Sequence, residues 1–283
     1  MIIAIASGKG GTGKTTVAVS LALSLDRAQY VDCDVEEPNG HLFLKPSITA
    51  RKDGVLLIPQ IDETKCNWCG VCQKACSYHA LAVIAQDKTA RGTVLFFPHL
   101  CHGCGACTYL CPRGAIREIP KPIGIIESGE SGTVHFVHGK LNVGEVMSPP
   151  LIRQVKKEIV PDLPVILDAP PGTSCPVIAA LKGSDSCILV TEPTPFGLND
   201  LRLAVEVVRT LGMPFGVISN RSDCGDDKTE RYCQEEKIPV LMNIPFRRAI
   251  AVAYSRGESL IAAVPAYRDA FRSLYDEIVR NLS

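Results

Sequence analysis

The ten residues SGKGGTGKTT at positions 7–16 follow the short apolar segment MIIAIA and fit two glycine motifs at once. The dinucleotide pattern G-x-G-x-x-G runs from Gly8 to Gly13, and the phosphate-loop pattern G-x-x-x-x-G-K-[ST] runs from Gly8 to Thr15. Lys14 and Thr15 favour the phosphate loop, because only that loop uses a lysine to reach the β and γ oxygens and a hydroxyl to ligate Mg²⁺. The sequence therefore predicts a site for a nucleoside triphosphate and Mg²⁺. Its expected loop residues are Gly8, Lys9, Gly10, Gly11, Thr12, Gly13, Lys14, Thr15 and Thr16.

Alternating apolar and helical segments around this loop indicate an α/β fold. MIIAIAS reads as a buried strand, a helix begins at Lys14, and YVDCD at 30–34 reads as the next strand. The same alternation resumes in the second half of the chain. The expected strands there are 164–170, 187–193, 214–220 and 239–245, and the expected helices are 149–160, 175–182, 197–211, 227–236, 246–255 and 266–281. This pattern predicts a mostly parallel sheet with helices on both faces, as in P-loop NTPases.

The alternation breaks between residues 61 and 118, where cysteine, glycine and proline replace periodic helices. We therefore expect one α/β domain made of residues 1–60 and 119–283, interrupted by a small inserted α+β domain at 61–118. Directly after the insert, the segments IGIIES and TVHFVHG suggest a β-hairpin.

Eight of the thirteen cysteines fall in two runs with one spacing, C-x₂-C-x₂-C-x₃-C, which is typical of bacterial ferredoxins with two [4Fe–4S] clusters. In a cytoplasmic chain such clustering indicates metal or redox chemistry rather than disulfides. The first three thiolates of a run wrap one cluster, and the fourth crosses to the other cluster. This assigns cluster I to Cys66, Cys69, Cys72 and Cys111, and cluster II to Cys101, Cys104, Cys107 and Cys76.

Structural zinc is the alternative for these cysteines. Zinc sites usually pair two C-x₂-C units some distance apart, and duplicated triplet-plus-one runs fit that arrangement poorly. The first run departs from the ferredoxin pattern in one place, because Ser77 follows Cys76 where Pro112 follows Cys111. Small residues within the runs, such as Gly70, leave room for backbone N–H groups to reach cluster sulfurs.

The composition points to no nucleic-acid or membrane partner. Thirty Lys and Arg residues balance thirty Asp and Glu residues, so the sequence shows neither a basic tail nor a polybasic patch. The longest apolar runs are too short to span a bilayer, and the opening MIIAIASGKG lacks the pattern of a signal peptide. We expect a cytoplasmic protein.

The glycine loop and two later segments resemble the MinD/ParA/Mrp ATPases, a superfamily that includes the nitrogenase iron protein. KGGTGKTT is similar to the deviant Walker A motif of these proteins, VDCDVEEPN to their first switch and LDAPPGT to their second. The resemblance implies that ATP is the nucleotide and that Lys9 reaches the partner's nucleotide across a dimer interface. It also implies that Lys14 and Asp34 are catalytic. Mg²⁺ would be held by Thr15, Asp34 and Asp168.

Shorter similarities extend this set of residues. Gly172 in the second switch would contact the γ-phosphate, Asn220 in GVISNR would read the adenine, and Pro245 in IPFRRAI would lie over the base. Cys175, just past the second switch, is a candidate ligand of a third cluster that bridges two subunits. A second cysteine for such a cluster is missing from 119–174, and the C-terminal C-x-x-C of Mrp-type scaffolds is also absent.

Three functions follow from these features. The leading hypothesis is an ATPase that couples nucleotide-driven homodimerisation to electron transfer through two [4Fe–4S] clusters, with an unidentified redox partner. The second is an ATP-dependent carrier or assembly factor that passes iron–sulfur or related metal cofactors to an acceptor protein. The third is a MinD/ParA-like positioning ATPase, which the neutral charge and the missing basic tail disfavour.

Overall fold

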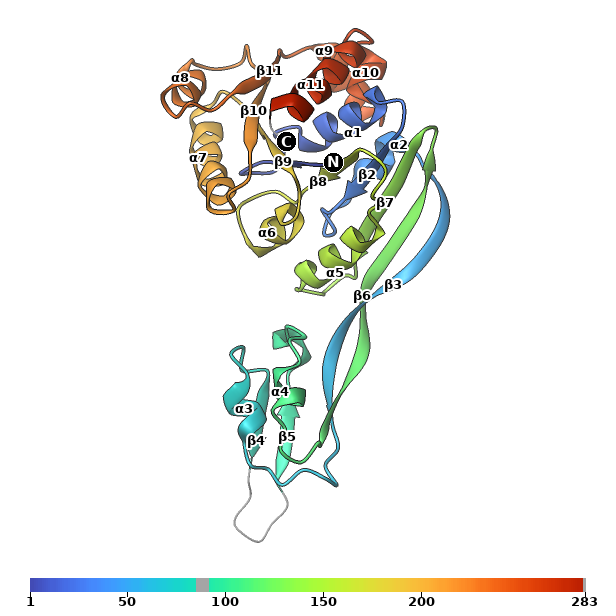
Figure 1. Ribbon diagram of the computed structural model, residues 1–283, viewed down its shortest axis with the longest axis vertical. Coiled ribbons are helices and arrows are strands. Elements are labelled where there is room, and N and C mark those ends of the chain that lie inside the picture. The colour runs from blue at the N-terminus through green and yellow to red at the C-terminus, as the bar shows by residue number, and fades with distance from the viewer. Residues whose placement is uncertain (85–91, 282–283) are drawn as a thin grey trace. The chain divides into compact units, whose positions relative to one another are not determined.

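The structure, a computed structural model, describes residues 1–84 and 92–281, and its main feature is a nine-stranded sheet (Figure 1). The strands of this sheet are β1 (Ile2–Ala6), β2 (Ala28–Asp32), β3 (Ser47–Ile61), β6 (Ile116–Ser131), β7 (Val134–Leu141), β8 (Val165–Asp168), β9 (Ser186–Thr191), β10 (Phe215–Asn220) and β11 (Val240–Ile244). They are arranged in the order β11-β10-β9-β1-β8-β2-β7-β6-β3. From β11 to β7 every neighbouring pair is parallel, which confirms the predicted mostly parallel sheet.

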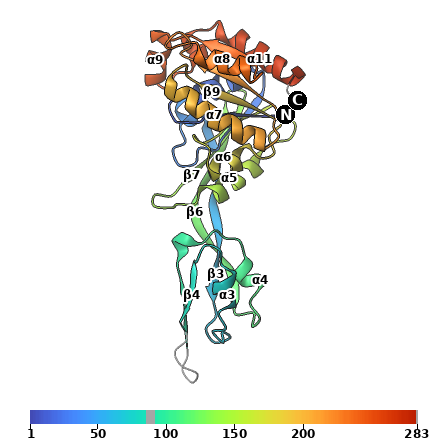
Figure 2. The ribbon, with the colours of Figure 1, turned by 90° about the vertical axis from the view of Figure 1, so that its left-hand side faces the viewer.

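Helices cover both faces of this sheet. They are α1 (Lys14–Ser24), α2 (Gly40–Leu44), α5 (Ser148–Val155), α6 (Cys175–Leu181), α7 (Pro195–Thr210), α8 (Lys228–Glu235), α9 (Arg248–Ser255), α10 (Leu260–Ala263) and α11 (Tyr267–Asn281). Two further helices, α3 (Val71–Ala75) and α4 (Ala106–Tyr109), belong to the cysteine-rich segment instead. The connection through α1 runs from β1 towards β2, whereas α6 and α7 lead in the opposite direction, towards β9 and β10. Because such crossovers are right-handed, the two sets lie on opposite faces. Figures 1 and 2 show α1 with α10 and α11 on one face and α6 and α7 on the other.

The strands and helices predicted after residue 148 are present, with ends that differ by a few residues. The suggested hairpin corresponds to β6 and β7, which are neighbours in the sheet and are separated by Gly132 and Thr133. The sequence did not predict β3. Its first seven residues are all exposed, so they carry no apolar alternation from which a strand could be recognised.

An extensive apolar core lies between the sheet and the helices α1, α10 and α11. It includes Ile3 and Ile5 of β1, Leu21 of α1, and Phe271 and Leu274 of α11, all of them buried. Tyr30 on β2 and Phe136 on β7 belong to the same core, where their rings stack with centroids 6.0 Å apart and are inaccessible to solvent. This core fixes the ends of β1 and β2 and the start of α1.

Contacts divide the chain into two compact units, which we name the sheet unit and the cysteine unit. The sheet unit comprises Met1–Lys52, Ile126–Lys140 and Ile152–Ser283, and the cysteine unit comprises Asp53–Ile125 and Leu141–Leu151. Within the cysteine unit, the antiparallel pair β4 (Leu81–Ile84) and β5 (Thr93–Phe96) accompanies the short helices α3 and α4. Its apolar core is small and contains cysteine side chains next to Leu81 and Ile116.

The bounds of the cysteine unit differ from the expected insert at 61–118. The unit begins earlier and ends later because two long strands run across the expected boundaries: β3 begins at Ser47 and ends at Ile61, and β6 continues from Ile116 to Ser131. Residues 85–91 of the expected insert and 282–283 of the expected second α/β segment lie outside the described residues.

In the part of the chain that the structure describes, no helix has both the length and the apolar character required to cross a bilayer.

The position of Phe271 generates a stability prediction. Its ring is fully buried in the core between the sheet and α11, so Phe271→Ala should lower the free energy of unfolding by about 3–5 kcal/mol. Phe196, at the start of α7, is 78% exposed, and Phe196→Ala should change it by less than about 0.5 kcal/mol. Denaturant unfolding, monitored by circular dichroism, measures the free energy of unfolding of both variants. Equal losses in the two variants would contradict this assignment of the core.

Candidate functional site

The glycine loop joins β1 to α1 and presents the first turn of that helix to a pocket. Gly13 is the residue before the helix, and its φ of 95° is a left-handed conformation that glycine adopts without steric cost. Gly8 lies against α7, where an added Cβ would be 2.1 Å from the backbone oxygen of Asp200. Lys14 and Thr15 are the first two residues of α1, so the partial positive charge of the helix N-terminus adds to the Lys14 ammonium.

A pocket of about 460 Å³ opens over this loop, within the range typical of small-molecule sites. The predicted residues that line it are Gly10, Gly11, Gly13, Lys14, Thr15, Thr16, Asp34, Asn220 and Pro245. The lining residues that the sequence did not indicate are Glu37, Asn39, Pro171, Arg221, Phe246, Arg247, Ile250, Ala251 and Tyr254. Phe246, Arg247 and Ile250 lie in the segment IPFRRAI, of which the resemblance implicated only Pro245. Ala251 and Tyr254 of α9 lie outside every segment that carries the resemblance.

Five predicted residues do not line the pocket: Gly8, Lys9, Thr12, Asp168 and Gly172. The backbone N–H of Gly172 donates to the Ser7 carbonyl over 3.0 Å, which fixes the second-switch segment beside the loop. Thr12 is buried, and its hydroxyl has no hydrogen-bond partner among the described residues. Lys9 is half-buried, and its backbone carbonyl accepts a bond from the Ser7 hydroxyl over 2.6 Å.

Carboxylates gather where β2 and β8 end. Asp32 and Asp168 are register partners on these neighbouring strands, and both are fully buried. The Lys14 ammonium lies 4.0 Å from Asp168 Oδ1, and the Tyr30 hydroxyl donates to Asp168 Oδ2 over 2.9 Å. Tyr30 is a residue that sequence reading missed, because a tyrosine inside a buried strand reads as ordinary core.

Burial raises the pKa values of Asp32 and Asp34. Burial, followed by the charge of Asp168, raises the pKa of Asp32 well above its usual range, although backbone N–H bonds from Gly40 (3.0 Å) and Asp34 (3.1 Å) oppose the shift. Burial raises the pKa of Asp34 to about 6, with the positive charge of Lys14 opposing and the charge of Asp168 adding to the rise. A bound cation at this position would stabilise the ionised forms of these carboxyl groups.

The donor set fits Mg²⁺. Asp168 Oδ1 is buried and accepts no hydrogen bond from the described residues, so one carboxylate oxygen is left for a cation or its water. Thr15 is buried at the first turn of α1 and also lines the pocket, as does Asp34. Oxygen ligands of this kind, completed by waters and phosphate oxygens, are what Mg²⁺ prefers.

The resemblance implies that Asn220 reads the adenine, and in this structure the side chain is hydrogen-bonded within the protein. Its Nδ2 donates to the Thr12 carbonyl over 2.8 Å, and its Oδ1 accepts the backbone N–H of Arg221 over 3.0 Å. Asn220 thus fixes the glycine loop to the end of β10. Phe246 and Tyr254, which line the same pocket, supply aromatic surface there.

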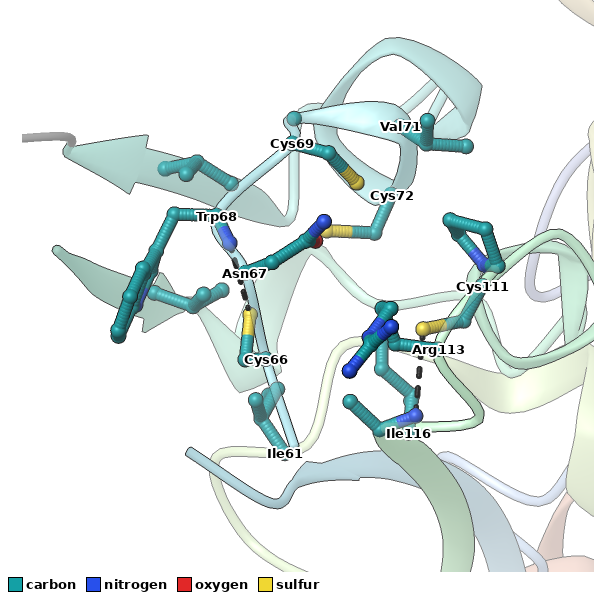
Figure 3. A pocket seen from close by; sticks show the side chains of 15 residues that line it. Ile61, Cys66, Asn67, Trp68, Cys69, Val71, Cys72, Cys111, Arg113 and Ile116 are labelled. Carbon is teal, nitrogen blue, oxygen red and sulfur yellow. Dashed lines mark hydrogen bonds between the residues drawn. The ribbon is translucent and has the colours of Figure 1, made fainter. Parts of the chain in front are cut away.

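The eight run cysteines line two pockets of the cysteine unit. Cys66, Cys69, Cys72 and Cys111 line the first pocket (Figure 3), and Cys76, Cys101, Cys104 and Cys107 line the second. These are the two crossed sets that the spacing predicted. All eight are free thiols. Each set combines cysteines of both runs because α3 packs against α4. Helix α3 follows the first two cysteines of the first run, and α4 follows the first two cysteines of the second run.

Backbone N–H groups point at the sulfurs in both pockets. Cys66 Sγ accepts from the Trp68 N–H over 3.4 Å, and Cys111 Sγ accepts from the Ala115 N–H over 3.3 Å, as Figure 3 shows. In the second pocket, the Gly103 N–H donates to Cys101 over 3.5 Å and the Ala80 N–H donates to Cys76 over 3.3 Å. Such bonds stabilise thiolates and the sulfurs of a bound cluster.

The thiols surround each pocket instead of meeting at one point. In residues 1–84 and 92–281, no group of three or more His, Cys, Asp or Glu side chains could hold a single metal ion. A [4Fe–4S] cluster offers a separate iron to each of four thiolates, so its ligands stand around a core. The arrangement of four cysteines around each pocket fits that requirement.

The five remaining cysteines lie outside both pockets. Cys33, Cys187 and Cys233 are buried, and burial raises the pKa of each thiol, that of Cys233 to about 11. Cys224 is exposed in a loop. Cys175, the first residue of α6, is exposed as well. Its part in a bridging cluster stays a prediction.

The raised pKa of Asp34 predicts that the nucleotide-free protein is destabilised by this carboxylate. Because the folded pKa of about 6 exceeds the reference value of 3.8, the penalty is absent below about pH 4 and complete above about pH 6. Asp34→Asn should therefore raise the free energy of unfolding by about 1–2 kcal/mol at pH 7.5 and give no gain near pH 4. Denaturant unfolding at the two pH values measures this, with exposed Asp162→Asn as the control. A variant that is less stable than the parent at pH 7.5 would contradict it.

Comparison with known proteins assigns the family. Residues 3–261 match the family described as the CobQ/CobB/MinD/ParA nucleotide binding domain. The chain is 32% identical over 268 residues to protein MJ0579 of Methanocaldococcus jannaschii, covering 92% of this chain and 91% of that protein. It is 24% identical over 307 residues to the iron-sulfur cluster carrier protein of Pyrococcus horikoshii, covering 99% of this chain and 86% of that protein.

Among solved structures, the septum site-determining protein MinD of Pyrococcus horikoshii, complexed with Mg-ADP, matches with a TM-score of 0.58 at 20% identity. The match covers 98% of this chain and 95% of that chain, and it shows the same fold. With the P-loop, its lysine and its buried carboxylates in place, the chain belongs to the CobQ/CobB/MinD/ParA nucleotide binding domain family and is a P-loop ATPase of the MinD/ParA type.

Proposed function

We propose that this ATPase holds two [4Fe–4S] clusters in its cysteine unit and uses its nucleotide state to control one-electron transfer through them. The observation that carries the proposal is the pair of pockets, each lined by four cysteines drawn from both runs, in a chain that also contains a P-loop. Bound clusters of this type supply one-electron storage at low potential. The chain itself supplies the thiolates, the N–H bonds to sulfur and the enclosure.

At the nucleotide site, this proposal assigns a role to each charged group. Lys14 and the first turn of α1 bind the β- and γ-phosphates, while Thr15, Asp34 and Asp168 hold Mg²⁺ and its waters. Of Asp32, Asp34 and Asp168, only Asp34 lines the pocket. Asp34 is therefore the carboxylate best placed to position the attacking water. The buried Tyr30 hydroxyl keeps Asp168 oriented through its 2.9 Å bond.

The position of Lys9 supports the proposal that a second copy of the chain takes part in hydrolysis. It lies in the nucleotide loop but does not line the pocket of its own chain, and its side chain is half-buried. In an ATP-bound homodimer, Lys9 would place its ammonium near the neighbour's γ-phosphate, where negative charge develops.

Coupling between the two sites would follow the chain itself. The first-switch segment after Asp34 leads into α2, whose first residue, Gly40, donates its N–H to Asp32 Oδ2 over 3.0 Å. The strand β3 follows α2, and the cysteine unit begins within that strand at Asp53. A nucleotide-dependent movement of the switch would therefore act on the segment that enters the cysteine unit.

A second candidate function is delivery of clusters to acceptor proteins. It is favoured by the relatives named iron-sulfur cluster carrier proteins, which align with 99% of this chain. The two functions differ in a measurable way. An electron carrier keeps its iron while its acceptor is reduced, whereas a cluster carrier loses iron and sulfide to the acceptor.

Iron content tests the cluster assignment. Protein prepared without oxygen should hold about eight iron and eight sulfide per chain, and Cys72→Ser should lower both by about half or more. Cys233→Ser, which removes a buried thiol outside both pockets, should leave them unchanged. Zinc in place of iron, or equal metal in both variants, would sink the cluster proposal.

Nucleotide control is tested with reduced, cluster-loaded protein and a one-electron acceptor dye. ATP and Mg²⁺ should change the rate of dye reduction by about fivefold or more, and Lys14→Ala should abolish the change together with nucleotide binding. Lys9→Ala should bind ATP but neither dimerise nor hydrolyse it.

Two results would count against gated electron transfer. Equal dye-reduction rates with and without ATP would remove the gating. Loss of iron and sulfide from this protein to an apo-ferredoxin, faster with ATP, would favour the carrier function instead.

A further inference from the structure

The two cysteine pockets are built from two copies of one backbone pattern. Each residue of the second run lies 35 positions after its counterpart, as from Cys66 to Cys101 and from Cys76 to Cys111. The first cysteine of each set accepts an N–H bond of 3.4 or 3.5 Å, and the crossing cysteine accepts one of 3.3 Å in both sets. In each set the exposed thiol is the second one. The bonds to the first and the crossing sulfurs, one factor that sets cluster potentials, are thus nearly equal at the two sites. Each set also has one buried thiol, Cys72 in the first and Cys101 in the second.

Charge breaks this symmetry at two pairs of equivalent positions. Arg113 lines the first pocket, and the position equivalent to it in the second pocket is occupied by Tyr78. Glu118 lines the second pocket, and the equivalent position in the first is Val83. Each pocket therefore pairs one charged residue with one neutral residue, and the two charges have opposite signs.

Both charged side chains lie close to cluster ligands. Figure 3 shows the Arg113 side chain turned into the first pocket, between Cys66 and Cys111. The Glu118 carboxylate lies against the second run, since a Cβ added at Gly105 would be 3.3 Å from Glu118 Oε1.

Among the described residues, no ion pair compensates these two charges. Within the described ranges 1–84 and 92–281, neither Arg113 nor Glu118 forms an ion pair. Asp62 and Lys65, which precede the first run, pair with each other at 3.5 Å. Arg117, the neighbour of Glu118 in β6, donates to Gln60 over 2.6 Å.

From this placement we propose that Arg113 and Glu118 make the two sites electrically unequal, so that an electron rests at the Cys66, Cys69, Cys72, Cys111 site in preference to the other. The proposal rests on the proposed function, because it assumes that both sites hold a cluster. Each cluster gains one negative charge when it accepts one electron from a one-electron donor. A cation beside the cluster stabilises the added charge and a carboxylate opposes it. Arg113 and Glu118 are both exposed, so water weakens these effects without changing their signs.

The electron would therefore travel in a fixed order. A donor that reduces the site near Glu118 would pass its electron on to the site near Arg113, where it is held at the higher potential. The direction of electron flow is then a property of this chain, and the donor and acceptor need only reach the correct end.

A redox titration monitored by electron paramagnetic resonance tests this on the cluster-loaded full chain, with dithionite as reductant. The unmodified protein should show two reduction steps. Arg113→Tyr should lower the potential of the first step alone, Glu118→Val should raise that of the second step alone, and the double variant should bring the two steps together. Arg113→Lys, which retains the positive charge, should restore most of the separation.

All samples are titrated at one and the same pH. His102 also lines the second pocket, where it stacks on Tyr78 with ring centroids 3.4 Å apart. Iron and sulfide are measured in every sample. Protein that never binds iron refutes the proposed function. Fully loaded charge variants whose two potentials stay unchanged, or move together, refute the inequality alone. Should Arg113→Tyr lose its iron, Glu118→Gln carries the same test for the second step.

Discussion

The nucleotide site depends on one electrostatic arrangement, the Lys14 ammonium held 4.0 Å from the buried carboxylate of Asp168. Asp168 and Asp32 face one another because β8 and β2 are parallel neighbours in register, and β1 places the glycine loop at the same edge of the sheet. Burial raises the pKa of Asp34 beside them, with Lys14 opposing the rise and Asp168 adding to it. The folded chain bears that electrostatic cost at the position where a divalent cation and a triphosphate would bind.

Rigid packing around the loop supports this arrangement. The Tyr30 hydroxyl donates to Asp168, and the Tyr30 ring stacks on Phe136. Gly8 lies too close to the backbone of Asp200 to tolerate a side chain. Asn220 joins the loop to β10. The glycine loop is therefore fixed by α7 and by residues at the ends of β-strands.

The cysteine unit follows a different physical rule. Its apolar core is small, and cysteine side chains take part in it beside Leu81 and Ile116. Small units with little apolar core generally require metal or disulfides for stability, and all eight run cysteines are free thiols. If this unit holds the proposed clusters, their binding would stabilise its fold. Its internal repeat supplies two nearly identical sites, and only a few side chains such as Arg113 and Glu118 distinguish them.

The sequence by itself determined the features that depend on local spacing. The P-loop lysine and threonine, the strand–helix alternation and the two cysteine runs all have short-range patterns, because helix period, strand period and ligand spacing are local properties. Tertiary structure alone decided the rest. The exposed strand β3, the Tyr30–Asp168 bond, the engagement of Asn220 with the loop and the pocket wall from Phe246 to Tyr254 join residues far apart in the chain, so no periodicity announces them. The same holds for Arg113 and Glu118. The pocket that each of them lines depends on how the two repeats pack together.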